Sequence, residues 1–494
     1  MKRAKRGLSP ELINRLVVGL AVITGAIVRF KNIARASIWH DEGYTMMLSP
    51  RSPAQIIAGT ARDVHPPLYY EILHFWMKLF GSSELGARSL SAVCLLIAIV
   101  VGFGLVRHLF GDGPARLAAV YLALGPFLVR YSQEARMYAM VALWVLLATY
   151  FLVKALDAKR ATWWWIGYSL AIAAALYTHY YAVFAIAGHW LYVATRSRKS
   201  GQGLRSGSWW ASNIAAAALF APWVPSAYSQ FKRVQAAFWI PKVTMLTIPS
   251  TIAQFLTFTD LGAVQTVVRL SGFAVLVALT IGWLIQKPTK DRPARILVTA
   301  LTFLAPVAVF VLSFKRPIYV DRYFVFAAVG FYILLAALTI EAWPFKRLRL
   351  LQSLAVLATI ATFGFGIHNV YVQATHNMKA VGTYVDRNYG SGDLIVSGEL
   401  YTFFDFSYYN HTGIQTELLA PNGVSGYGET SLIYNRPGIL VKSFADLHPA
   451  SGYVWVIGKP NTGDFSGTPA NWHLLNSFQR ADSEVERFQV TASH

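Results

Sequence analysis

Long apolar stretches recur along almost the whole of this chain. About eleven of them reach the length of about 17–25 residues that a bilayer-spanning helix needs. Only 14% of the 494 residues are charged and 55% are hydrophobic, whereas soluble domains are about 25% charged. We therefore predict a mainly α, polytopic membrane protein with about 11 (10–13) transmembrane helices. The stretches lie at roughly 12–30, 88–107, 115–131, 137–156, 163–178, 180–195, 209–227, 267–286, 295–314, 320–341 and 348–368.

The net charge of +20 has two readings, a nucleic-acid partner or basic loops that fix membrane topology. Alternate loops between the stretches are basic, as at Lys154, Lys159 and Arg160. This positive-inside pattern predicts a cytoplasmic N-terminus, a retained first span and no nucleic-acid partner. The single cysteine, Cys94, excludes a disulfide within the chain.

Two regions remain outside the predicted spans, and both are expected on the outer face. We predict a transmembrane domain over residues 1–369, in which 31–87 form the first outer loop. A domain-sized α/β segment is predicted over residues 370–494. Its expected helices are 378–388 and 400–409, and its expected strands are 392–396, 452–458 and 487–491. A short apolar segment near 245–258 is predicted to be re-entrant or interfacial.

The first outer loop begins with Trp39-His40-Asp41-Glu42-Gly43-Tyr44. Adjacent carboxylates at a membrane face are costly unless they are solvated or used. The functional interpretation makes Asp41 a general base, with Glu42 orienting it or binding the acceptor. The alternative is a solvated helix cap at the membrane surface.

Asp63-Val64-His65-Pro66-Pro67-Leu68-Tyr69-Tyr70 follows in the same loop. Prolines at the start of a helix make a rigid N-terminus, and the free N–H groups there suit a phosphate. The alternative is that the two prolines end a loop and that His65 packs against them.

Two later clusters carry cations that suit phosphate oxygens. The segment 130–138 places Glu134 and Arg136 in a turn on the outer side, where an exposed turn would also tolerate them. The segment 314–324 places Lys315, Arg316 and Arg322 on the outside, against the positive-inside bias. A contact with anionic lipid headgroups is the alternative for this second cluster.

These motifs, in this order, resemble the membrane-embedded GT-C glycosyltransferases. The most similar group is the bacterial protein O-mannosyltransferase-like branch (glycosyltransferase family 39), which includes lipid A aminoarabinose transferases and rhizobial lipopolysaccharide galacturonosyltransferases. The resemblance implies an inverting transfer from a polyprenyl-phosphate sugar to a cell-envelope acceptor, at the outer face of a bacterial plasma membrane. The motif residues Asp41, Glu42 and Glu134 are then predicted to be catalytic. The predicted substrate-binding residues are His65, Tyr69, Arg136, Tyr138, Lys315, Arg316, Arg322 and Tyr323. Lys315 and Arg316 match no motif of the family and are predicted from their charge on an outside loop alone.

A metal is a further question that the resemblance raises, because some members bind a divalent cation near the site. His40, His65, Glu84 and His179 are candidate ligands, but their spacing carries no recognisable metal signature. No metal ligand or cofactor is therefore assigned from the sequence.

Three other functions compete with the sugar transferase. A lipid or polysaccharide transporter predicts a polar path through the spans, which the sequence lacks. A ligase-like transferase with a diphosphate-linked donor predicts a large outer loop late in the chain. A carbohydrate-binding receptor leaves the acidic first loop unexplained. The aromatic residues of the C-terminal segment suit either sugar stacking or a small core, namely Tyr401, Phe403, Phe404, Tyr408 and Tyr409.

Overall fold

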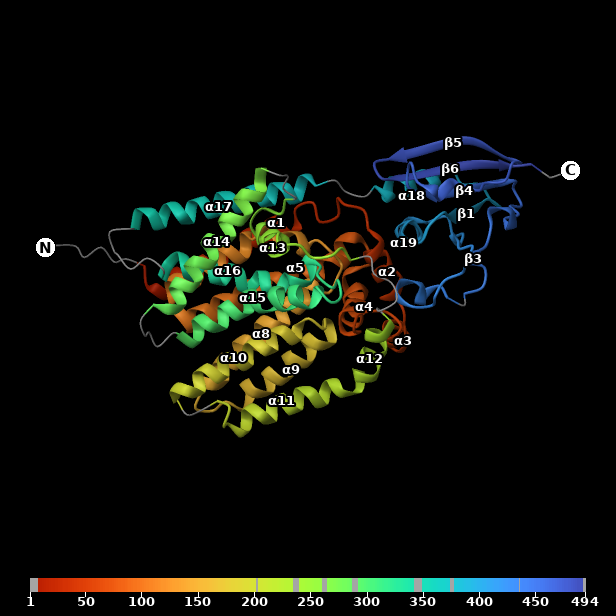
Figure 1. Ribbon diagram of the computed structural model, residues 1–494. Coiled ribbons are helices and arrows are strands. Elements are labelled where there is room, and N and C mark those ends of the chain that lie inside the picture. Colours follow the sequence, from red (N-terminus) through yellow and green to blue (C-terminus); the bar gives the residue numbers. More distant parts are fainter. Residues whose placement is uncertain are drawn as a thin grey trace. The chain divides into compact units, whose positions relative to one another are not determined.

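The computed structural model divides into two compact units (Figure 1). The helical unit comprises Met1–Lys31 and Arg88–Gln373, and the mixed unit comprises Asn32–Ala87 and Ala374–His494. The first loop thus groups with the C-terminal segment, whereas the sequence-based boundaries place it with the transmembrane domain. The structure describes residues 8–200, 203–233, 240–259, 264–286, 292–341, 349–373, 377–434 and 436–491. The basic N-terminal residues 2–6 lie outside these ranges.

Among the described residues, seven helices are long and apolar enough to cross a membrane, which fits a multi-pass membrane protein. These spans are Pro10–Phe30, Glu84–Phe110, Tyr138–Asp157, Thr266–Ile285, Arg292–Ser313, Asp321–Glu341 and Arg349–Val372. The helices from which they are drawn are α1 (Pro10–Phe30), α5 (Glu84–Phe110), α8 (Tyr138–Asp157), α14 (Val264–Ile285), α15 (Arg292–Ser313), α16 (Val325–Glu341) and α17 (Arg349–Val372). The span that ends at Glu341 also includes the 3-10 turn Asp321–Phe324 that precedes α16.

Shorter helices occupy most of the other predicted spans, so the count of about eleven stays a prediction. The stretch 115–131 is split into α6 and α7, while α9 has 17 residues and α11 has 14. The helix α13 has 11 residues and is about 16 Å long, too short to span a bilayer. The bounds of the remaining helices in this unit are α6 (Asp112–Leu124), α7 (Pro126–Ser132), α9 (Thr162–Thr178), α10 (Ala182–Ser200), α11 (Gly207–Phe220), α12 (Val224–Arg233) and α13 (Thr247–Thr257).

The break between α6 and α7 has an identifiable cause and a buried partner. Pro126 has no N–H to donate to the carbonyl of Leu122, so the helical ladder stops there. The fully buried guanidinium of Arg29 donates to the Leu122 carbonyl (2.8 Å) and to the Ala123 carbonyl (2.7 Å). Arg29 thus satisfies two carbonyls at the end of α6 that would otherwise face an apolar interior.

The mixed unit is built on a six-stranded sheet with strand order β3-β2-β1-β4-β6-β5 (Figure 1). The pairs β1–β2, β1–β4 and β2–β3 are parallel, whereas β4–β6 and β5–β6 are antiparallel. The strands are β1 (Leu394–Ser397), β2 (Glu417–Leu419), β3 (Leu440–Val441), β4 (Tyr453–Gly458), β5 (Trp472–Arg480) and β6 (Ser483–Val490). The helices are α2 (His40–Leu48), α3 (Pro53–Ala61), α4 (Leu68–Phe80), α18 (Met378–Asn388) and α19 (Leu400–Tyr409).

Strand β4 is buried on both faces, which explains its continuous apolar sequence. Val454 and Val456 pack with Phe444 and Phe488 on one face. Trp455, on the other face, contacts Tyr384 of α18. The predicted helices 378–388 and 400–409 match α18 and α19, and the three predicted strands match β1, β4 and β6 within a few residues.

The first loop joins this unit because α2 packs directly on α19. A Cβ atom on Gly43 would lie 2.6 Å from the carbonyl oxygen of Phe404, so only glycine permits this approach. The backbone N–H of Ile38 also donates to the hydroxyl of Tyr409 (2.8 Å). These contacts hold the acidic motif on the unit that carries the sheet.

Candidate functional site

The acidic motif forms the first turn of α2. Asp41 and Glu42 are buried there, with exposed fractions of 6% and 1%. The N-terminus of a helix carries a partial positive charge that stabilises carboxylates in the first turn. The structure therefore corrects the alternative of a solvated cap, because both carboxylates are buried.

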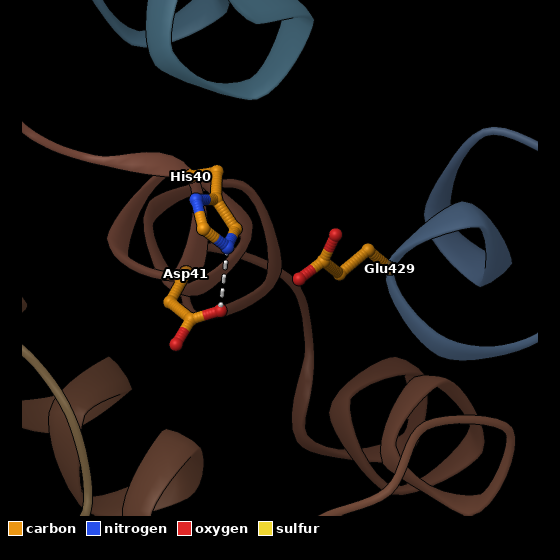
Figure 2. Close-up of side chains that lie close together, drawn as sticks. All are labelled: His40, Asp41 and Glu429. Atoms are coloured by element: carbon orange, nitrogen blue, oxygen red, sulfur yellow. Dashed lines mark ion pairs between the residues drawn. The ribbon is translucent and has the colours of Figure 1, made fainter. Parts of the chain in front are cut away.

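A third acid reaches this turn from a distant part of the chain. Figure 2 shows Glu429, on a separate segment, with its side chain directed toward His40 and Asp41. His40 Nε2 lies 3.3 Å from Asp41 Oδ1. One potential ligand atom from each of the three side chains lies within 4.8 Å of the others. Nitrogen and carboxylate donors are thus gathered around the aspartate that the sequence marks as the base.

This donor set fits a divalent cation by its chemistry. Imidazole nitrogen and carboxylate oxygen are ligands of Zn²⁺ and related ions. Of the candidates named from the sequence, His40 belongs to the cluster. Glu84 is instead paired with Lys379, with 2.9 Å between Glu84 Oε1 and Lys379 Nζ.

An aromatic residue of the C-terminal segment lies beside His40, and a lysine lies next to that aromatic ring. The ring of Tyr401, at the start of α19, lies 4.5 Å from the His40 ring. Lys459 Nζ lies 5.4 Å from the centre of the Tyr401 ring and 3.1 Å from Glu399 Oε1. Burial raises the pKa of the Tyr401 hydroxyl, and the neighbouring Glu429, Glu399 and Asp41 carboxylates raise it further. The Tyr401 hydroxyl therefore stays protonated at neutral pH.

The second motif of the first loop is buried as well. His65 Nδ1 lies 3.6 Å from Asp63 Oδ2, and both residues are buried just before α4. Tyr69 is fully buried in the first turn of α4, where its ring packs edge-on against Tyr70. The packing alternative for His65 is therefore supported by its burial, and its proposed phosphate role stays a prediction.

The predicted turn at 130–138 belongs to the helical unit and is buried rather than exposed. Glu134 and Arg136 are 2% and 3% exposed. Arg130 Nη1 donates to Glu134 Oε2 (3.0 Å), and Ser91 Oγ donates to the Glu134 carbonyl (2.7 Å). A buried carboxylate needs a paired cation, which Arg130 supplies here, whereas a carboxylate in an exposed turn would not need one.

The helical unit brings this turn to the late Arg322-Tyr323 pair. The Tyr138 and Tyr323 rings lie 6.0 Å apart, and the His179 ring lies 4.9 Å from Tyr323. Arg322 and Glu134 both lie within electrostatic reach of the Tyr131 hydroxyl.

Lys315 and Arg316 have other surroundings. Lys315 is exposed, and the guanidinium of Arg316 lies over the Phe231 ring at 5.2 Å from its centre.

Sequence reasoning missed Glu429 and Tyr401 as neighbours of Asp41, and Lys459 as a neighbour of Tyr401. Glu429 lies in a short 3-10 turn, Gly428–Leu432, with no periodic pattern. A signal did exist for Lys459, because it directly follows β4, which pairs in parallel with β1. Side chains after the carboxyl ends of adjacent parallel strands are the usual place for a ligand site.

Comparisons with known proteins were made for both sequence and structure. Residues 64–225 match the model of the dolichyl-phosphate-mannose-protein mannosyltransferase family. The matched third of the chain holds the His65 motif and the Glu134 turn. No curated protein matches the chain in sequence.

Solved structures extend the likeness to nearly the whole chain. ArnT from Cupriavidus metallidurans bound to undecaprenyl phosphate matches with a TM-score of 0.67 at 13% identity, over 95% of this chain and 97% of that chain. The oligosaccharyltransferase AglB from Archaeoglobus fulgidus, in complex with an inhibitory peptide and a dolichol-phosphate, matches with a TM-score of 0.50 at 12% identity. The AglB match covers 82% of this chain and 64% of that chain. The resemblance to GT-C glycosyltransferases is confirmed by the family match and the shared fold.

Proposed function

We propose that this protein, a membrane-embedded glycosyltransferase, transfers a sugar from a polyprenyl-phosphate donor to a cell-envelope acceptor with inversion at the anomeric carbon. The observation that carries the proposal is the buried Asp41 carboxylate beside His40 and Glu429. Similar structures are named for undecaprenyl phosphate and dolichol-phosphate bound to them, and the same lipid class is proposed here. The acceptor side is the outer face of a bacterial plasma membrane, and the N-terminus is cytoplasmic.

The reaction is a single displacement. The acceptor hydroxyl oxygen forms a bond to the anomeric carbon as the bond from that carbon to the donor phosphate breaks. The hydroxyl proton passes to the Asp41 carboxylate, which acts as general base. Polyprenyl phosphate leaves as a weakly basic anion, so the mechanism needs no general acid.

The departing phosphate gains charge that cations must offset. Arg136 and Arg322 are the proposed phosphate-binding residues, because guanidinium pairs with phosphate oxygens in a bidentate manner. Glu134, held by Arg130, positions the turn that carries Arg136.

The proposal includes a divalent cation held by His40, Asp41 and Glu429. Bound there, the cation would supply positive charge and Lewis acidity beside the reacting groups.

The test is donor turnover by the purified full-length protein in detergent. A panel of polyprenyl-phosphate sugars would be offered to wild type and to Asp41→Asn, and released polyprenyl phosphate would be measured. The proposal expects one donor to be consumed by wild type and to be bound but not consumed by the variant. Near-normal turnover by Asp41→Asn would show that Asp41 is not the general base. Binding of a diphosphate-linked donor instead of a monophosphate-linked one would favour the ligase-like reaction.

A further inference from the structure

A cavity of about 600 Å³ lies within the mixed unit, behind the helix that carries Asp41. Its volume falls in the range of about 300–1,000 Å³ that is usual for ligand pockets. The side of α2 that bears Gly43 and Met46 forms one wall, and Asp41 lies on the opposite side of the same helix. The lining contains none of His40, Asp41 and Glu429. The cavity is therefore separate from the candidate catalytic cluster.

The floor of the cavity is apolar. Met46, Met77 and Phe404 line it and are buried. The partly exposed ring of Tyr408 stands at its edge, held in place because its hydroxyl donates to the Ser82 carbonyl (2.9 Å). Aromatic and methionine side chains of this kind offer a surface to the C–H faces of a ligand.

Another part of the lining is polar and contains the carboxylate of Glu84, which can accept hydrogen bonds. The Glu84 side chain, 10% exposed, receives hydrogen bonds at Oε1 from Lys379 Nζ (2.9 Å) and from the Tyr409 hydroxyl (3.2 Å). Glu84 and Lys379 thus form an ion pair on this part of the lining, and the Tyr409 hydroxyl adds a second donor to the same oxygen. Among the described residues, no other residue donates a hydrogen bond to Oε2.

These two walls select a class of ligand. Glu84 and Lys379 neutralise each other, and at the rim His411 Nδ1 lies 3.2 Å from Asp386 Oδ2. An anion thus finds no unpaired cation among these groups, and an acyl chain would leave the Glu84 carboxylate buried without water. A glycan fits both walls, because its hydroxyls can donate to Glu84 while its C–H faces cover the methionines.

We infer that this cavity binds the part of the acceptor glycan that lies beyond the reacting sugar. The inference rests on the proposed function and adds an acceptor-binding site to it. The protein then recognises a part of the acceptor that is polar, uncharged and rich in hydroxyl groups. Recognition and chemistry are divided between two faces of α2.

The test fills the cavity without touching the catalytic cluster. Ser407 lines the cavity, and its hydroxyl donates to the Phe403 carbonyl one turn earlier (2.6 Å). In Ser407→Trp, the indole occupies the cavity. The matched control is Thr383→Trp on α18, because exposed Thr383 makes the same kind of bond, to the Lys379 carbonyl (2.8 Å), outside the cavity lining.

The probe is an array of bacterial oligosaccharides, exposed to labelled full-length protein in detergent. Wild type and Thr383→Trp are expected to bind the same glycans, and Ser407→Trp to bind them roughly tenfold or more weakly. Glu84→Gln is expected to weaken binding as well, since it removes the charged acceptor. Thermal unfolding of each variant shows that the fold is kept.

Equal binding by Ser407→Trp and wild type would overturn the inference, as would the absence of any bound glycan with wild type. Release of polyprenyl phosphate without acceptor, measured in parallel, separates the two proposals. Glycan binding without donor turnover would contradict the proposed function and support the glycan-binding cavity. Donor turnover without glycan binding would support the proposed function and contradict the glycan-binding cavity.

Discussion

Gly43 lies against the backbone of Phe404 so closely that a Cβ atom on it would sit 2.6 Å from the Phe404 carbonyl oxygen. Real Cβ atoms do not approach backbone oxygen at this distance, so α2 and α19 must separate if any other residue stands there. The same helix α2 carries Asp41 on one side and the cavity wall on the other. The close packing at Gly43 therefore sets the position of Asp41 and of the cavity wall.

Gly43→Ala is expected to destabilise the mixed unit by roughly 1–3 kcal/mol, in the range of overpacked sites, and to lower transfer activity because Asp41 moves with α2. Thermal unfolding and donor turnover would be measured together. The control is Gly463→Ala, where the added Cβ meets Ser466 Oγ at an ordinary 3.6 Å. Wild-type stability in Gly43→Ala would contradict the close packing.

Glu429→Gln is expected to weaken divalent-cation binding about 10–100-fold while leaving the fold unchanged, because it removes the charge from one of three gathered donors. Isothermal titration with Zn²⁺ and with Mn²⁺ gives the affinity directly, without relying on activity. Glu399→Gln serves as control, since that carboxylate is paired with Lys459. Equal metal affinity in wild type and Glu429→Gln would show that Glu429 is not a metal ligand and would contradict the proposed site.

The sequence predicts the local elements well and the distant neighbours poorly. Helices α18 and α19 match their predicted bounds because apolar periodicity is a local property. The position of Glu429 beside Asp41 depends on how loops fold over the sheet, and no period encodes it. The burial of Glu134 was missed for the same reason, since a charged turn looks exposed until its partner Arg130 is placed.

Arg322→Ala is expected to lower kcat about 10²–10³-fold if Arg322 offsets charge on the leaving phosphate, the usual cost of removing one such donor. Arg322→Lys keeps the charge but loses the bidentate fork, so we expect an intermediate rate. Donor turnover under saturating donor measures both. Lys232→Ala, on the exposed surface of α12, is the control, and an equal rate loss in it would point to a general charge effect.

Asp405 gives a pH-dependent prediction. Burial raises the pKa of this carboxyl to about 9, and its Oδ1 atom has no hydrogen-bond partner among the described residues. The folded protein therefore holds a proton that the unfolded chain releases near pH 4. Since the folded state binds more protons between these values, stability falls as pH rises from about 4 to about 9.

Asp405→Asn mimics the neutral acid, so this variant is expected to be more stable than wild type at pH 8 and to lose most of the pH dependence in this window. The melting temperature from pH 5 to pH 9 is the measurement. The control is Asp386→Asn, which changes a carboxylate paired with exposed His411. This control is expected to shift the melting temperature little. A wild-type melting temperature that rises with pH in this range would contradict the assignment.

Arg29→Met tests the buried cap of α6. The substitution keeps much of the side-chain volume but leaves the Leu122 and Ala123 carbonyls without the donors that Arg29 supplies. Each unsatisfied buried group costs about 1–3 kcal/mol, and an apolar surrounding offers no water to replace it. We therefore expect a lower melting temperature and a shorter half-life in detergent. Arg15→Met is the matched control on the same helix, because the Arg15 side chain is 77% exposed and pairs with the half-exposed Glu11. If both variants melt at the wild-type temperature, the carbonyls at the α6 break have another donor, and Arg29 does not cap the helix.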